Sequence, residues 1–212
     1  MRYITTIAVL LGSLCTAAMP PAYAQHQAQH TNAIPSHELL PSLPPELEKI
    51  RAALDKYKDP IVAVHDGYHS TVGCVAFPQG GGAGQAPYRP GAMGVHFLNL
   101  GLIGPNLDPL SPQLLIYEPV GDQLRLVAAE WFVPLATGIK ERPQLFGQAF
   151  WGPMEGHHPM MPVQLHHYDL HVWLWKQNPY GLFSATNPDV NCPPGPYNAA
   201  HVAPKLLPEQ QP

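Results

Sequence analysis

Histidine and aspartate alternate with apolar residues near the C-terminal end of the sequence, where residues 167–175 read HYDLHVWLW. If this segment forms a strand, one face carries His167, Asp169 and His171 followed by two tryptophans, which is unusual for a plain solvent face. Strand residues two apart lie about 6.6 Å apart, and residues four apart lie about 13 Å apart. Asp169 can therefore share a metal ion with either histidine, whereas His167 and His171 cannot easily share one.

Two residues of other expected strands can complete such a site. His96 lies in an apolar segment and faces away from its two apolar neighbours. Glu130 alternates with Leu126, Ala128 and Phe132, so it falls on an apolar face, where an unpaired charge is costly. This pattern predicts either a metal or acid–base site or a hydrogen-bond network that organises the core around Glu130. The strand-borne candidate ligands are His96, Glu130, Asp169 and His171.

A second group of potential ligands is local in the sequence. Eight histidines and methionines fall between residues 154 and 171. Imidazole with thioether is a copper ligand set, because soft sulfur suits Cu(I) and imidazole suits Cu(II). The alternative is a polar loop whose histidines do not converge. The candidate ligands of this loop are His157, His158, Met160 and Met161, and His26, His30 and His37 nearer the N-terminus could add weak sites.

Composition excludes several other partners. The chain has 11 Lys and Arg against 15 Asp and Glu and no basic stripe, which argues against nucleic acid. The glycine run at 80–84 lacks the Lys-Ser/Thr of a phosphate loop, so no nucleotide cofactor is expected. The sequence contains no Gly-x-Ser-x-Gly motif, so nucleophilic catalysis is poorly supported.

The first residues have the features of a removable signal peptide. Arg2 precedes an apolar run, and Ala22-Tyr23-Ala24 has the small-x-small pattern of a cleavage site. A lipid on Cys15 and an uncleaved anchoring helix are the alternatives, but the apolar run is short and no stable membrane anchor is expected. We therefore predict a signal peptide at 1–24, a flexible leader at 25–42, one β-rich domain at 43–192 and a Pro-rich tail at 193–212. The protein would be periplasmic or secreted.

Removal of the signal peptide leaves two cysteines, Cys74 and Cys192. In an oxidising compartment such a pair usually forms a disulfide, and two free thiols are the alternative. A disulfide between Cys74 and Cys192 would close the long loop between them, for which chain entropy gives a stabilisation of roughly 4–5 kcal/mol.

The many prolines and glycines, which interrupt helices and strands, indicate the fold class. The chain has 27 prolines and 18 glycines, which favours short antiparallel strands in a small barrel or sandwich, with one N-terminal α-helix. The helix is expected from Pro44 and Pro45 until Asp59-Pro60 ends it. A hairpin is expected around 119–123. The expected strands are 61–64, 71–77, 93–98, 114–118, 124–133 and 165–175.

Three segments resemble signatures of an uncharacterised family of exported bacterial proteins. They are GAMGVHF at 91–97, YEP at 117–119 and HYDLHVWLWK at 167–176. The likeness spans roughly residues 45–192. It implies export, and it implies no activity, ligand or catalytic residue.

Taken together, these observations predict an exported metal-binding protein whose ion is copper or another transition metal. One alternative is a β-barrel that binds a small molecule with the same face. The other is an enzyme that uses Glu130 and His171 as an acid–base pair. Protein partners are not predicted by the sequence.

Overall fold

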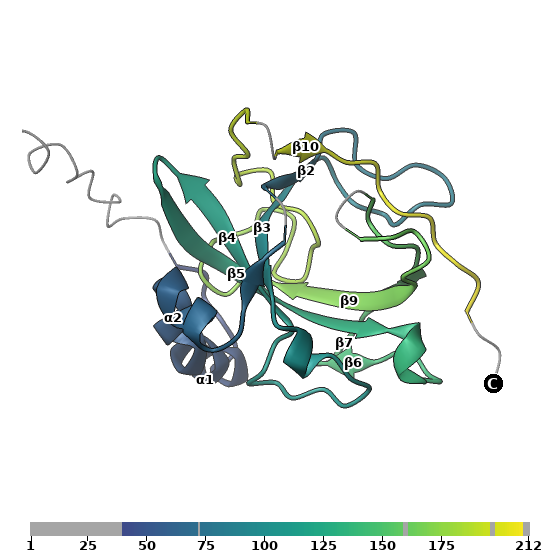
Figure 1. The fold of residues 1–212 in the computed structure, drawn as a ribbon, viewed down its shortest axis with the longest axis horizontal. Coiled ribbons are helices and arrows are strands. Elements are labelled where there is room, and N and C mark those ends of the chain that lie inside the picture. Colours follow the sequence, from purple (N-terminus) through teal and green to yellow (C-terminus); the bar gives the residue numbers. More distant parts are fainter. Residues whose placement is uncertain (1–39, 72, 159–160, 196–197, 210–212) are drawn as a thin grey trace, which may run out of the picture. The chain divides into compact units, whose positions relative to one another are not determined.

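The computed structural model describes residues 40–71, 73–158, 161–195 and 198–209. The predicted signal peptide and most of the predicted leader lie outside these residues. The fold is mainly β, as predicted, and its main sheet has the strand order β10-β2-β3-β4-β5-β9-β8, with β1 paired to β3 (Figure 1). Neighbouring strands are antiparallel except β10 and β2. The sheet is open and is not closed into a barrel.

Most of the predicted strands are present with shifted ends, and β4 and β5 form the predicted hairpin. Gly121, in its turn, has a φ of 62°, a conformation that glycine adopts readily. The strands are β1 (His69–Ser70), β2 (Val75–Phe77), β3 (Gly91–Leu98), β4 (Leu114–Val120), β5 (Gln123–Pro134), β6 (Gln144–Leu145), β7 (Gln148–Ala149), β8 (Trp151–Met154), β9 (His167–Val172) and β10 (Ala199–Ala200).

Two α-helices precede the sheet where the sequence predicted one. The predicted helix is α1 (Pro45–Leu54), continued by the 3-10 turn η2 (Asp55–Lys58). The expected strand at 61–64 is wrong, because α2 (Pro60–His65) occupies it. The Asp59 side chain accepts a hydrogen bond from the Ile61 N–H, and Pro60 stands in the first turn. Asp-Pro therefore ends one helix and also caps the start of the next. Further 3-10 turns are η3 (Leu100–Leu102) and η4 (Leu135–Thr137).

The two faces of the sheet pack against different layers. Alternate residues such as Leu115, Trp131 and Leu170 form one core cluster with Leu47 and Ile50 of α1. Figure 1 shows α1 and α2 together beside the sheet. The other face carries the polar residues considered below. Strand alternation thus separates an apolar face from a face with ionisable side chains.

Loops and the C-terminal segment pack against this second face. The His201 N–H donates to the Ala76 carbonyl, and the Leu206 N–H donates to the Gly84 carbonyl. A core cluster that includes Phe77, Tyr88 and Ala203 joins these segments. The described part of residues 193–212 is therefore packed on the domain, although its composition alone resembles a free tail.

The predicted disulfide between Cys74 and Cys192 is confirmed, with a sequence separation of 118. It links the residue just before β2 to the segment that leads into β10. Among the described residues, no helix is both long and apolar enough to cross a membrane.

Candidate metal centre

Three buried side chains converge from three strands of the sheet. Glu130 on β5 lies opposite His171 on β9 in the antiparallel register. His96 comes from β3, which is separated from β5 by β4. The exposed fraction is 4% for His96, 4% for Glu130 and 0% for His171. The sheet therefore unites residues far apart in the sequence, and Glu130 is buried as predicted.

A glycine two residues before His96 sets the path of β3. Gly94 has a φ of 119°, and a Cβ there would lie 2.5 Å from the carbonyl oxygen of Tyr117 on β4. Any other residue would be strained and would push the strands apart. The close approach of β3 and β4 helps His96 to reach over β4 towards Glu130.

An irregularity between β4 and β5 changes the expected alternation. The register shifts, so that Tyr117 pairs with Leu126 while Ile116 pairs with Ala128. Leu126 therefore packs with the helices on the opposite face. Our prediction that Leu126 shares a face with Glu130 is wrong, because a bulge reverses the parity of side chains beyond it.

The spacing of the ligand atoms suits a metal ion better than hydrogen bonds. The Glu130 Oε2 atom lies 3.5 Å from the His96 Nε2 atom and 3.5 Å from the His171 Nε2 atom. Good N–H···O bonds are shorter, and the Glu130 Oε2 and both ring nitrogens of His171 have no hydrogen-bond partner in the described part of the chain. Ligands on a tetrahedral ion with bonds of about 2.0–2.1 Å lie about 3.3 Å apart. The three ligand atoms lie within 4.8 Å of one another, so they could hold one ion.

Burial controls the ionisation of this group. Desolvation lowers the pKa of His96 to about 3, and the nearby His171 contributes in the same direction. Desolvation also lowers the pKa of His171 and, together with the charge of Asp169, raises the pKa of Glu130 well above its usual range. The histidines are therefore neutral at physiological pH, which is the form that binds metal ions.

A small cavity of about 80 Å³ adjoins the three residues. A buried water needs roughly 10–15 Å³ on the same kind of measure, so the cavity can hold an ion with a few waters. Thioethers and a third imidazole also line it. The lining residues are Thr71, Met93, His96, Leu98, Leu114, Glu130, Phe132, His157, Met161, Leu165 and His171.

The predicted loop site is divided by the structure. His157 is buried and faces the cavity together with Met161, whereas His158 is exposed. Met160 lies outside the described residues. The structure therefore does not bring His158 to the cavity with His157 and Met161, and a joint loop site stays a prediction.

Asp169 was expected to share a metal ion with His96 and His171, but its carboxylate has other neighbours. Its carboxylate groups with His157 and His167, and these three residues are a second set whose ligand atoms lie within 4.8 Å of one another. As predicted from strand spacing, His167 and His171 belong to different sets. The sequence candidates omitted His167, although it shares a strand face with Asp169 and His171.

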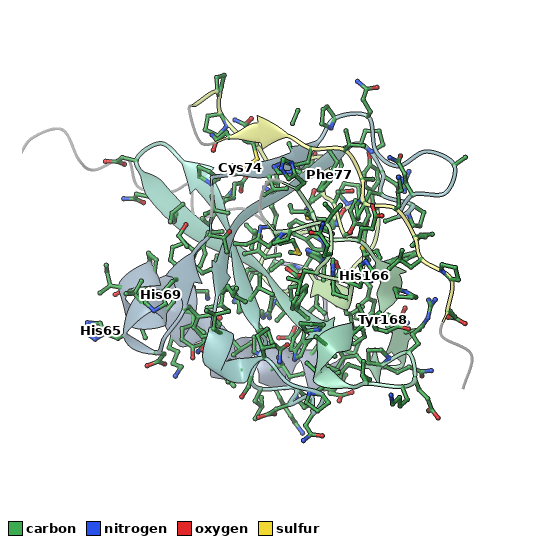
Figure 2. The ribbon with its side chains drawn as sticks, turned by 45° about the vertical axis from the view of Figure 1, so that its right-hand side comes forward. His65, His69, Cys74, Phe77, His166 and Tyr168 are labelled. Atoms are coloured by element: carbon green, nitrogen blue, oxygen red, sulfur yellow. A yellow bond between two sulfur atoms is a disulfide. The ribbon has the colours of Figure 1, made fainter. Side chains whose placement is uncertain are left out.

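Other histidines stand apart from both sets. His65 and His69 are exposed and lie near α2, away from Phe77 (Figure 2). Phe77 contacts the ring of His157, with centroids 6.1 Å apart. His201 is buried beside the same ring of Phe77 but belongs to neither set, so burial alone does not identify the candidate ligands.

Comparison with protein-family models finds no match, and comparisons with curated proteins and with solved structures find none either.

Proposed function

We propose that this chain is an exported protein that binds a transition-metal ion through His96, Glu130 and His171. The observation that carries the proposal is the convergence of two neutral imidazoles and one carboxylate, all buried, with unsatisfied polar atoms 3.5 Å apart. Burial disfavours the charged form of Glu130, and a divalent ion would displace its proton and offset the cost of the buried carboxylate.

The donor set favours copper. Two imidazoles and a carboxylate suit several divalent ions, and at such a site Cu(II) binds more tightly than the other first-row divalent ions. The thioethers of Met93 and Met161 line the same cavity and are ligands suited to Cu(I). Zn(II) is the principal competitor, because two histidines and one glutamate are also the ligands of catalytic zinc sites.

Export is supported by two independent features. The N-terminal segment has the pattern of a cleavable signal peptide. The Cys74–Cys192 disulfide is typical of proteins that work in an oxidising compartment. Both agree with the resemblance to exported bacterial proteins, and together they favour the periplasm or the medium.

The volume of the cavity disfavours an organic ligand at this position. Pockets for drug-sized ligands usually measure about 300–1,000 Å³, and a cavity of about 150 Å³ binds benzene. The cavity beside His96 measures about 80 Å³. An ion with one or two small ligands therefore fits better than a sugar or an aromatic compound.

An acid–base enzyme is the second candidate function, favoured by the contact between Glu130 and His171 beside a cavity. Ionisable groups whose pKa values are shifted by burial are frequent in active sites. Such an enzyme would need neither metal nor the imidazole of His96 as a ligand. Metal binding therefore separates the two candidates.

The test is a titration of Cu(II), Cu(I) and Zn(II) into untagged, chelator-treated mature protein. We expect at least one site tighter than about micromolar and at least a 100-fold loss of affinity at that site in Glu130→Gln and His96→Leu. The matched control is Glu118→Gln, a buried glutamate outside the cavity. A second control replaces His26, His30 and His37 by alanine. If no ion binds better than about millimolar, or if only the second control loses binding, the proposal is wrong.

A further inference from the structure

The second set, His157, His167 and Asp169, repeats the donor composition of the first. It also has two imidazoles and one carboxylate, all within 4.8 Å. The exposed fraction is 4% for His157 and 0% for His167 and Asp169. The His167 Nε2 atom and both carboxylate oxygens of Asp169 have no hydrogen-bond partner among the described residues.

Neighbouring groups hold these imidazoles in place. The His167 Nδ1 atom lies 3.0 Å from the Leu165 carbonyl oxygen, to which it donates when it carries the proton. This bond leaves Nε2 as the free nitrogen, the arrangement that usually orients a metal-binding histidine. The His167 ring also stacks at a tilt on Phe132, with centroids 4.7 Å apart.

The loop after β8 brings His157 to the same place. The Gly156 N–H donates to the Val163 carbonyl, and the Met161 N–H donates to the His157 carbonyl, so the loop turns back on itself. A Cβ on Gly156 would lie 1.9 Å from the Pro162 carbonyl oxygen. The loop can fold this tightly because residue 156 is glycine. The His157 ring then lies 5.1 Å from the His167 ring, centroid to centroid.

An ordinary histidine–aspartate hydrogen bond does not explain this set. The His167 Nε2 and Asp169 Oδ2 atoms are 3.7 Å apart, which is too long for such a bond. A fully buried aspartate without a donor or a cation at bonding distance is costly. An ion held by the carboxylate and both imidazoles would satisfy these atoms.

The two sets adjoin one another. His157 lines the cavity that His96, Glu130 and His171 also line. Asp169 and His171 are two residues apart on β9, so their Cα atoms lie about 6.6 Å apart. Ions held by the two sets would therefore lie close to one another, one in the cavity and one beside it, with His157 between them.

We propose that His157, His167 and Asp169 bind a second metal ion next to the first, so that the two sets together form a two-ion centre. The ligand class is a divalent first-row transition metal, with Cu(II) or Zn(II) as the ions that suit these donors. This inference rests on the proposed function of the first site and extends it to a second set of ligands.

The experiment measures stoichiometry on untagged, chelator-treated mature protein whose three leader histidines are replaced by alanine. Calorimetric titration with Cu(II) alone and with Zn(II) alone, followed by elemental analysis, should give two ions per chain. Asp169→Asn and His167→Leu should each retain one ion, as should His96→Leu. The combination of Asp169→Asn with His96→Leu should retain none.

Electron paramagnetic resonance adds a readout of proximity. Two neighbouring Cu(II) ions should broaden or reduce each other's signal, whereas Asp169→Asn loaded with one Cu(II) should give the full, narrow signal of an isolated ion. Near-ultraviolet circular dichroism checks that each variant is folded.

The outcomes distinguish this inference from the proposed function. One ion per wild-type chain, lost in His96→Leu and kept in Asp169→Asn, overturns the second site and leaves the first. No ion in the wild-type protein overturns both. If a variant does not fold, the stoichiometry of the wild-type protein still decides, because one ion contradicts the inference and two ions support it.

Discussion

Two buried glutamates on neighbouring strands have opposite surroundings. Glu118, at 3% exposure, pairs with Arg125, lies 3.2 Å from the Lys176 ammonium and accepts a hydrogen bond from the Asn191 N–H. Glu130, at 4% exposure, faces two imidazoles, and no lysine or arginine is among the described residues that line its cavity. The protein thus supplies side-chain cations to one carboxylate and potential metal ligands to the other.

This difference separates a structural ion pair from a binding site. A buried carboxylate is tolerated when cations and hydrogen-bond donors satisfy it. The Glu118 cluster meets that condition with the protein's own groups, and its partners join β4, β5 and the segment next to Cys192. The Glu130 cluster meets it when a metal ion supplies the positive charge. Substitutions in the two clusters should therefore have different effects on stability and on metal binding.

Removal of the disulfide should cause the largest loss of stability. The affected region should be the one around Glu118. Asn191 donates to Glu118 and is adjacent to Cys192. Replacing both cysteines by alanine frees a loop with a separation of 118 residues, for which we expect a loss of about 4–5 kcal/mol. Urea denaturation measures this loss. The metal stoichiometry of the folded fraction should be unchanged, and its loss would contradict the independence of the two clusters.

The matched substitutions Glu118→Gln and Glu130→Gln should have different effects on the free energy of unfolding of the metal-free protein. Glu118→Gln removes the carboxylate that Lys176 and Arg125 contact, and we expect a loss of about 3–5 kcal/mol. Glu130→Gln removes a carboxyl group whose burial disfavours its charge, so stability should stay within about 0.5 kcal/mol or rise. Chemical denaturation with chelator present compares them. Equal losses would mean that Glu130 is a structural residue like Glu118.

The sequence predicted features that depend on local pattern. Alternation and turn chemistry predicted the hairpin of β4 and β5, and alternation placed Glu130 among buried residues. Composition predicted the mainly β fold, and the cysteine count predicted the disulfide. The wrong prediction of a strand at 61–64 also has a local cause, because Asp59-Pro60 serves equally to end a helix and to start one.

The grouping of the ligands depends on long-range geometry. His157 meets His167 because the loop turns back at Gly156, and spacing along the chain contains no sign of that turn. His158, its neighbour, points to solvent for the same reason. The bulge that moves Leu126 to the other face is a pairing irregularity between two strands. Sequence patterns identified most of the residue types of the centre, but the pairing of strands decides which of them meet.

Metal binding should stabilise the protein through the Glu130 cluster and its neighbouring ligand set, and not through the Glu118 cluster. An ion at 100 times its dissociation constant stabilises the folded state by about 2.7 kcal/mol per site. We expect this gain in wild-type protein and in Glu118→Gln, measured as the shift in denaturation midpoint when Cu(II) or Zn(II) replaces chelator. Glu130→Gln should lose the part of the gain that comes from the first site. A full gain in Glu130→Gln would place the ion elsewhere.

The smallest expected effect of a single substitution is on the pH dependence of the metal-free protein. Burial lowers the pKa values of His96, His157 and His171, and that of His96 falls to about 3. The unfolded chain binds a proton at each histidine near pH 6.5, whereas the folded chain does not. Unfolding therefore takes up a proton at each of these histidines, whereas Glu130, whose pKa is raised in the folded chain, releases one. The net uptake makes stability fall as the pH decreases from about 6.5 towards the lowered pKa values.

The expected slope is about 1.4 kcal/mol per pH unit for each of these histidines. Denaturation of chelator-treated protein at several pH values between about 7.5 and 5 measures it, and His96→Leu should reduce the slope by one such increment. His69→Ala is the matched control, because His69 is exposed and should leave the slope unchanged. A slope that is the same in His96→Leu as in the wild-type protein would show that His96 takes up a proton in the folded state, as an imidazole paired with an ionised Glu130 would. The Glu130 cluster would then resemble the Glu118 cluster, a buried pair of protein charges that needs no metal ion.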